Sequence, residues 1–237
     1  MTDRQDELLR REDWRFFAIT KLGTGLGMIA TTEVLPSGEL ANFGLPSAPA
    51  LFLSLAFASH RKRAGIDAAS LFDRHPAPQG TYPDNHTPLF DYFESAIAEV
   101  VFSYSAVEAA ANESIPETFV YQRLWKAGQA PVSLTREEIE RTVPLDEKLK
   151  RVLPQALNKV SPAGGRLWPP YLELQDLRDR LIHLKSADRN DSGPEDETIW
   201  GRLLRIGPVV FPSVAADLIS SFYEPNRRWI KSGLIGA

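Results

Sequence analysis

The sequence predicts a mainly helical protein, and three observations carry this prediction. The longest amphipathic pattern repeats apolar residues every three or four positions between Pro88 and Ile115, which is the period of an α-helix rather than of a strand. Patterns of the same kind run from Tyr171 to Lys185 and from Pro212 to Tyr223. Helices with an apolar stripe bury it by packing on one another, so we expect a helical bundle.

Composition narrows the class of protein before any motif is considered. The 237 residues, 43% of them hydrophobic, suffice for one large domain or for an average domain with a sizeable extension. The net charge of −4 lacks the basic surplus of proteins that hold nucleic acid mainly through its phosphates, so any RNA site must be local. The absence of cysteine excludes disulfides, thiolate catalysis and cysteine-ligated metals.

The first residues of the chain predict where the protein resides. Residues 1–13 carry charges of both signs and lack the apolar core of a secretion signal. The most apolar segment, Pro49–Ala58, is about half the roughly 20 residues that a membrane-spanning helix needs, and the basic stretch His60–Arg63 follows it. We therefore expect a cytoplasmic protein with no membrane partner.

Residues 1–86 form a predicted N-terminal extension, for which the sequence leaves helical and mixed structure open. Glycines at 23, 25 and 27 interrupt an apolar run from Trp14 to Leu35 that fits either a helix or a hairpin. Pro49–Arg63 is predicted to be a buried helix, because its basic end suits the C-terminal side of a helix dipole. A turn-rich linker then runs from His75 to Pro88.

The helical bundle is predicted to span residues 87–224, followed by a C-terminal tail at 225–237. Its long helix is expected to have Thr87 as N-cap and Pro88 at the first helical position. Pro116 ends this helix after about 27 residues, or about 40 Å, which suits the spine of a bundle. Shorter helices are expected at Arg136–Arg141 and Leu145–Leu157.

The helix predicted at Tyr171–Lys185 carries the most informative chemistry, in the run Leu177–His183. Arg178 can hold a phosphate bidentately, and His183 can accept or donate a proton near neutral pH. Roughly 140° separates these two residues on a helix, whereas Asp179 and His183 share one face. Asp179 can therefore orient the imidazole and favour its charged form, while the long Arg178 side chain can turn toward a shared phosphate.

These residue types suit the cleavage of RNA. RNA supplies its own nucleophile, the 2′-hydroxyl, so scission needs a base, a group that stabilises the phosphorane charge, and an acid for the leaving 5′ oxygen. One arginine and one histidine fill two of these roles. A second copy of the helix completes the set, with one imidazole as base and the other as acid, which makes a homodimer part of the hypothesis. The alternative is an ordinary solvated helix face.

The run Arg178–His183 resembles the Arg-x4-His signature of the HEPN superfamily, including the polar residue, Asp179, directly after the arginine. Residues Phe102–Glu113 are similar to the acidic and amide-bearing long helix against which those domains pack the motif helix. The resemblance covers Pro88 to about Tyr223. It implies a compact HEPN-like helical bundle that dimerises, with the paired motifs in a cleft.

The resemblance also implies a range of functions. Many HEPN domains are metal-independent endoribonucleases of toxin–antitoxin, phage-defence or RNA-processing systems, and others have lost catalysis and bind nucleotides or protein partners. If this chain is a catalytic HEPN-like domain, we expect it to need no cofactor. Its expected partners are RNA or a nucleotide, and an antitoxin protein. The alternatives are a non-catalytic dimeric module and a structural scaffold with a buried His183. Carried over, the catalytic residues are Arg178 and His183, Asp179 tunes them, and Glu108 or Asn112 braces the site.

Other motifs carry weaker chemistry. No metal site is expected, because the remaining histidines lie in separate segments without short-spaced ligands. The glycine run fits neither the dinucleotide-binding nor the P-loop pattern and is interpreted as a turn. The basic clusters are interpreted first as solvated surface and second as contacts to RNA. These residues are His60, His75 and His86; Gly23, Gly25 and Gly27; and Arg61–Arg63 and Arg227–Trp229.

Overall fold

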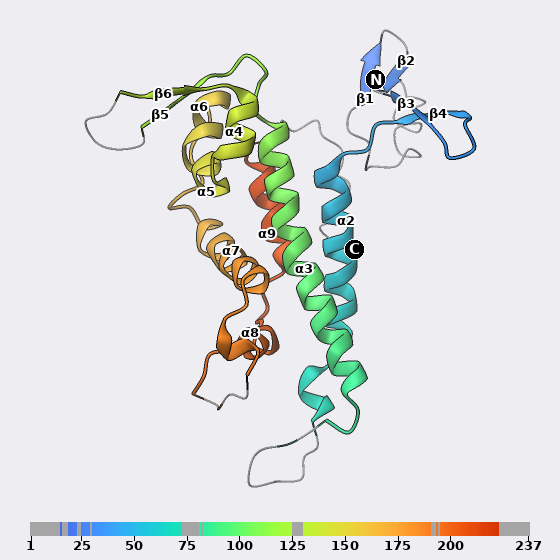
Figure 1. The fold of residues 1–237 in the computed structure, drawn as a ribbon, viewed down its shortest axis with the longest axis vertical. Helices are drawn as coiled ribbons and strands as arrows, with labels where there is room; N and C mark the ends of the chain where they lie inside the picture. The colour runs from blue at the N-terminus through green and yellow to red at the C-terminus, as the bar shows by residue number, and fades with distance from the viewer. Residues whose placement is uncertain are drawn as a thin grey trace.

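The computed structural model describes residues 15, 19–22, 25–28, 30–72, 81, 83–124, 130–190, 193 and 195–222. Within them the protein is mainly helical with three two-stranded antiparallel hairpins (Figure 1), which confirms the predicted fold class. None of the described helices is long and apolar enough to cross a membrane. The predicted C-terminal tail, with Arg227–Trp229, lies outside the described residues, as do His75 and Gly23.

Hairpins and one long helix make up the described part of the N-terminal extension, so its structure is mixed. For the run Trp14–Leu35, in which the sequence left helix and hairpin open, the described residues 19–22, 25–28 and 30–34 are strands and none of the described residues is helical. Gly38 lies in the turn of the second hairpin with φ +85°, a left-handed conformation that glycine adopts without steric penalty. The hairpins pair β1 (Ile19–Leu22) with β2 (Gly25–Met28), and β3 (Ala30–Val34) with β4 (Leu40–Gly44).

Two long helices form the most extensive helix pair of the protein: α2 (Ala48–Ala64) and α3 (His86–Glu113). They run antiparallel and side by side (Figure 1). The predicted N-cap of the long helix is wrong, because Asn85 rather than Thr87 caps it, with the Asn85 side chain accepting from the Thr87 N–H at 2.9 Å. Because α2 ends before residue 86 and α3 begins there, the domain boundary predicted at residue 86 separates two helices that pack along each other.

A buried ion pair joins α2 to α3 and was not predicted. Glu99 is fully buried and accepts hydrogen bonds from Arg63 Nε at 2.6 Å and from His60 Nδ1 at 3.1 Å. Burial lowers the pKa of Arg63, but the hydrogen bond and charge of Glu99 raise it by more, so Arg63 stays charged. Arg63 therefore leaves the solvated basic cluster in which the sequence placed it and serves the core instead.

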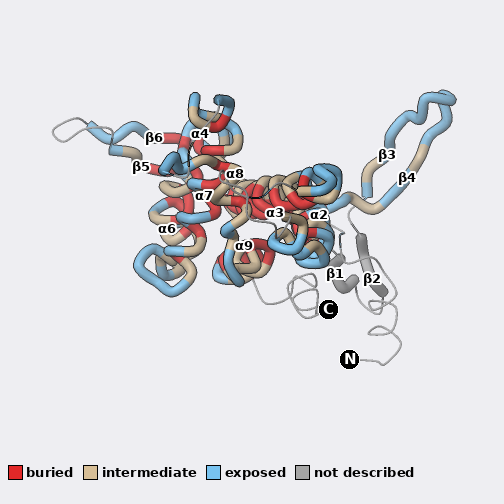
Figure 2. Tube along the Cα trace, turned by 90° about the horizontal axis from the view of Figure 1, so that it is seen from below, coloured by how far each residue is buried: buried red, intermediate tan, exposed pale blue. Residues whose placement is uncertain are grey.

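The rest of the chain packs around α3. Buried residues concentrate where α3, α7 and α9 meet, while the β3–β4 hairpin extends outward and is mostly exposed (Figure 2). A π-helical turn interrupts the helix predicted at 145–157, because Pro154 has no N–H for the Lys150 carbonyl. The elements are η1 (Ala68–Leu71), β5 (Tyr121–Arg123), β6 (Val132–Leu134), α4 (Arg136–Thr142), α5 (Leu145–Glu147), η2 (Lys148–Val152), α6 (Leu153–Leu157), α7 (Trp168–Ile182), η3 (Ser186–Asp188), α8 (Ile199–Leu204) and α9 (Phe211–Ser220).

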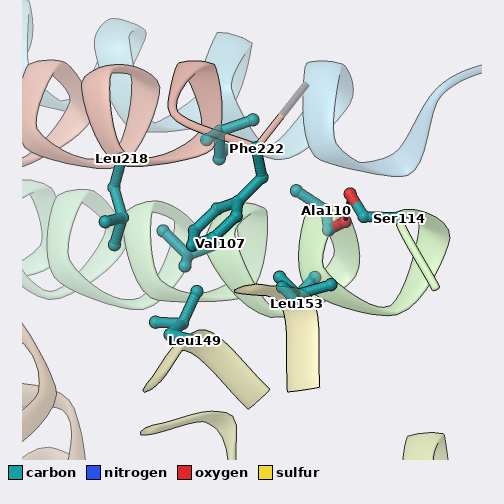
Figure 3. Close-up of a pocket in the computed structure, with 9 residues that line it drawn as sticks. Val107, Ala110, Ser114, Leu149, Leu153, Leu218 and Phe222 are labelled. Atoms are coloured by element: carbon teal, nitrogen blue, oxygen red, sulfur yellow. Dashed lines mark hydrogen bonds between the residues drawn. The ribbon is translucent and has the colours of Figure 1, made fainter. Parts of the chain in front are cut away.

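A small cavity of about 10 Å³ lies between α3, the η2–α6 segment and α9 (Figure 3). The Phe222 ring closes it against Val107 and Leu149, and the Ser114 hydroxyl is the polar side-chain group in its lining. A space of this size holds one water at most. It is a packing gap in the core and gives no room for a substrate.

Candidate functional site

The predicted catalytic residues lie at the C-terminal end of α7. Arg178 and Asp179 are in its last turns, whereas His183 is the residue that follows Ile182, with non-helical φ −119° and ψ 65°. The His183 N–H still donates to the Asp179 carbonyl at 2.9 Å. The helix therefore ends earlier than the predicted Lys185, and the imidazole extends from a helix end instead of from a helix face.

His183 is exposed and lines an open cleft of about 350 Å³ between the end of α7 and the α8 region. This placement contradicts the scaffold alternative, in which the imidazole is buried. The cleft is rich in charges of both signs, so it is a polar surface on which an ionic ligand can bind. Its lining consists of Asp176, Asp179, Arg180, His183, Lys185, Glu197 and Arg202.

Arg178 is held by two contacts. Its guanidinium lies over the Tyr104 ring of α3, 4.7 Å from the ring centroid, and its Nη1 donates to Asp179 Oδ1 at 2.9 Å. Partial burial lowers the pKa of Arg178, but the hydrogen bond with Asp179 and the nearby negative charges raise it by more, so the net pKa is raised. The cation is therefore permanent and oriented.

The structure brings Asp179 to both predicted catalytic residues, although the two do not share one surface. The Asp179 carboxylate pairs with the Arg178 guanidinium, and Asp179 also lines the cleft together with His183. Arg178 turns toward Tyr104 on α3 and is absent from the described lining of that cleft. In one protomer the Asp179 carboxylate therefore orients the arginine, whereas the predicted hydrogen bond between that carboxylate and the His183 imidazole is not found among the described residues.

The two residues predicted to brace the site both lie on α3, but only the charge of Glu108 acts on Arg178. Burial and, after it, the charge of the half-buried Glu108 raise the pKa of Tyr104, and the same charge is one of several that raise the pKa of Arg178. For Lys148 the charge of Glu108 opposes the effect of burial without outweighing it, so the pKa is lowered. Asn112 instead accepts a hydrogen bond from Lys148 Nζ at 2.8 Å. The amide thus stabilises a lysine of η2, not the arginine of α7.

Lys148 is a buried cation that the sequence interpretation missed. Its Nζ also donates to the Glu140 carbonyl at 2.9 Å, and burial lowers its pKa. The signal was its spacing, since Lys148 lies three residues after Leu145 and four before Val152, both buried. A lysine on an apolar stripe needs partners inside the protein, and α3 supplies one of them.

Two tyrosines complete a polar seam between α3 and α7, which we define as Tyr104, Glu108, Asn112, Lys148, Tyr171 and Arg178. Tyr171 is fully buried, and its hydroxyl has no hydrogen-bond partner in the described part of the chain. Burial raises the pKa of both phenols, that of Tyr104 to about 12. The Tyr104 phenol is therefore neutral near pH 7, and its buried ring supports the Arg178 guanidinium that lies over it.

We expect the Tyr104 phenol to make stability fall at high pH. Its pKa is about 12 in the folded protein and 10.0 ordinarily, so the unfolded chain ionises first and this stabilisation is lost as pH rises from 10 to 12. One such group contributes a slope of about 1.4 kcal/mol per pH unit. Urea unfolding of Tyr104→Phe should show a shallower decline than the wild type, and equal slopes would contradict the assignment.

A second ion pair fixes the chain beyond α7. Arg180 Nε and Nη2 donate to the two carboxylate oxygens of Asp188 at 2.7 and 2.9 Å, and Nη2 also donates to the Glu197 carbonyl at 3.1 Å. Asp188 further accepts from the backbone N–H groups of Lys185 at 2.8 Å and Ile199 at 2.7 Å. The hydrogen bond with Arg180 lowers the pKa of Asp188. This Arg180–Asp188 clamp shapes one wall of the cleft.

The clamp was also missed, because Asp188 lies beyond the end of the helix predicted at Tyr171–Lys185. Comparison with other proteins adds no template for the site: no known protein family, curated protein sequence or solved structure is similar enough to this chain to be matched. Among the described residues no group of three or more His, Cys, Asp or Glu side chains is arranged to hold a metal ion. The chemistry of the site therefore rests on the residues around α7.

Proposed function

We propose that this chain is a HEPN-like helical protein that cleaves RNA as a homodimer, without a metal, through Arg178 and His183. The observation that carries the proposal is the exposed His183 imidazole in a polar cleft, five residues after an arginine that Tyr104 and Asp179 orient. A cationic fork and a titratable ring at one helix end are the groups that phosphodiester scission requires.

The reaction uses the 2′-hydroxyl of the RNA as nucleophile. A neutral His183 accepts its proton as the 2′ oxygen attacks phosphorus, and the bond from phosphorus to the 5′ oxygen breaks. The protonated His183 of the second copy donates a proton to that 5′ oxygen. The products are a 2′,3′-cyclic phosphate and a 5′-hydroxyl, so protons balance and no external reactant is consumed.

Arg178 stabilises the charge that develops on the non-bridging oxygens. In the free protein one of its donors is occupied by Asp179, and a guanidinium has five N–H donors in a fixed fork. The remaining donors can meet a phosphate while Asp179 keeps the fork in place. Asp179 thereby sets the orientation of Arg178 and competes with the substrate for it.

Cleavage of single-stranded RNA in the presence of a chelator tests the proposal. We expect His183→Ala to lower the cleavage rate by about 100-fold or more, since it removes both the acid and the base, while the circular-dichroism melt stays unchanged. His86→Ala is the matched control, because His86 is also exposed but lies at the start of α3. Cleavage that needs added metal, or that survives in His183→Ala, would refute the mechanism.

A non-catalytic, nucleotide-binding or protein-binding dimer, with an antitoxin protein as one such partner, is the second candidate. The Arg178–Asp179 pair and the acidic net charge of −4 favour it, because both weaken attraction for a long polyanion. In this case Arg178→Ala weakens the binding of ATP in calorimetry or weakens self-association, and RNA stays intact throughout a long incubation. The RNA-cleavage assay therefore separates the two candidates.

A further inference from the structure

The helix α2 is apolar on two opposite faces. Ala50, Leu53 and Phe57 are buried in the core. On the outer side, Leu51 and Leu55 are 37% and 46% exposed. A helix that is apolar all round is normally covered on both sides. The exposed outer residues Ala48, Leu51, Leu55 and Ala58 follow steps of three, four and three, which is the spacing of a seam between two packed helices.

The β3–β4 hairpin adds exposed apolar side chains next to this seam. Val34 and Leu40 are cross-strand partners and are 68% and 71% exposed. A two-stranded hairpin has little stability alone in water, so a covering surface would stabilise it. The hairpin extends from the N-terminal end of α2, on the side of the molecule away from α7 (Figures 1 and 2).

Charge indicates what covers this surface. The only charged residues between 30 and 47 are Glu33 and Glu39, and neither has an ion-pair partner in the part of the chain that is described. The other end of α2 is basic, with Arg61 exposed and Lys62 forming only a long contact of 3.9 Å with Asp91. Two antiparallel copies of α2, each about 25 Å long, place the acidic hairpin of one beside the basic end of the other.

We infer that the outer face of α2 and the β3–β4 hairpin bind a second copy of this chain, with the two α2 helices antiparallel. A parallel arrangement would put the two basic ends together and the two acidic hairpins together, which charge repulsion disfavours. The inference does not depend on the proposed nuclease activity, because α7 lies on the other side of α3 (Figure 1). Arg178 and His183 stay accessible in this dimer, and a composite site would join two such dimers.

Sedimentation equilibrium of the full chain tests the surface. The wild type should be at least dimeric, and Leu51→Glu with Leu55→Glu should raise the dissociation constant of the α2 contact by at least about 100-fold, because carboxylates without partners would be buried in the seam. Val160→Glu is the control, since Val160 is 90% exposed in the loop after α6, and should leave the dimer intact. A monomeric wild type, or a glutamate variant with the same assembly state and dissociation constant as the wild type, overturns the inference.

Crosslinking tests the orientation and does not depend on how the glutamate variant folds. The chain contains no cysteine, so introduced thiols are unique. In an antiparallel seam Leu51 faces Leu55 of the second copy, and a mixture of Leu51→Cys with tagged Leu55→Cys should form the tagged–untagged disulfide in preference to either symmetric one. Preferred symmetric crosslinks would establish parallel helices, and no crosslink at all would exclude the seam.

Charge reversal tests the hairpin contact separately. Glu33→Lys with Glu39→Lys should raise the dimer dissociation constant by about tenfold, because like charges then meet across the interface. Adding Arg61→Glu and Lys62→Glu to the same chain should restore the wild-type value. If the fourfold variant is no tighter than the double variant, the acidic hairpin does not meet the basic end of α2.

Discussion

Replacement of Asp188 by alanine is expected to lower the free energy of unfolding by about 3–5 kcal/mol, the range for breaking a buried ion pair from one side. The Asp188 carboxylate has a fully buried side chain and accepts two hydrogen bonds from Arg180 and two from backbone N–H groups. Its removal leaves the buried Arg180 guanidinium without a counter-charge. Urea unfolding followed by circular dichroism measures the loss.

The same clamp predicts a pH dependence with a definite sign. The pKa of Asp188 is lowered by Arg180 in the folded protein, so its stabilisation is complete above the ordinary aspartate pKa of about 3.9 and is lost as pH falls below it. The difference in stability between wild type and Asp188→Ala should therefore narrow in acid. A difference that stays constant down to acid unfolding would show that the charge of Asp188 does not stabilise the fold.

An exposed ion pair with a similarly short contact provides the control. Arg202 Nη1 lies 2.6 Å from Asp176 Oδ2, but the Asp176 side chain is 68% exposed. Water and salt screen such pairs, so Asp176→Ala should lower the free energy of unfolding by about 1 kcal/mol or less. If Asp176→Ala and Asp188→Ala are equally destabilising, burial is not what makes the clamp strong.

Glu99→Leu is expected to be as damaging, with a loss of about 3–5 kcal/mol, because it leaves Arg63 buried without its partner between α2 and α3. Arg63→Leu should lower the free energy of unfolding by a similar amount, because it leaves the buried Glu99 carboxylate without its arginine partner. The double variant should be more stable than either single variant, since a buried pair is often replaced by apolar residues at little cost. A double-mutant cycle in urea measures this coupling, and additive losses would contradict it.

Helix positions were predictable where an apolar stripe faces the core. The stripes located α3, α7 and α9 to within a few residues, the helix-start signal before Arg136 located α4, and the basic end of its apolar segment located α2. The α8 helix, with six residues, is too short to show a period. The N-cap was wrong because Asn85 and Thr87 are both good capping residues, and only the three-dimensional path of the chain decides which side chain reaches a free N–H.

The candidate site was predictable as a set of residues but not as a set of contacts. Arg178 and His183 were found because they lie five residues apart in one short segment of the sequence. The partners of Asn112 and Arg180 are Lys148 and Asp188, and a pairing between side chains of separate elements follows from tertiary packing. Sequence spacing predicts which residues share a helix face. It does not predict which element that face meets.

The antiparallel arrangement of α2 and α3 also has a kinetic consequence. These helices are neighbours in sequence and form the most extensive helix pair, so their contacts close only a short loop and rank among the fastest to form in a folding chain. By contrast, α9 returns to them from about a hundred residues away along the chain and must dock later. Refolding should thus proceed from this helical hairpin, with α9 completing the core in the last phase.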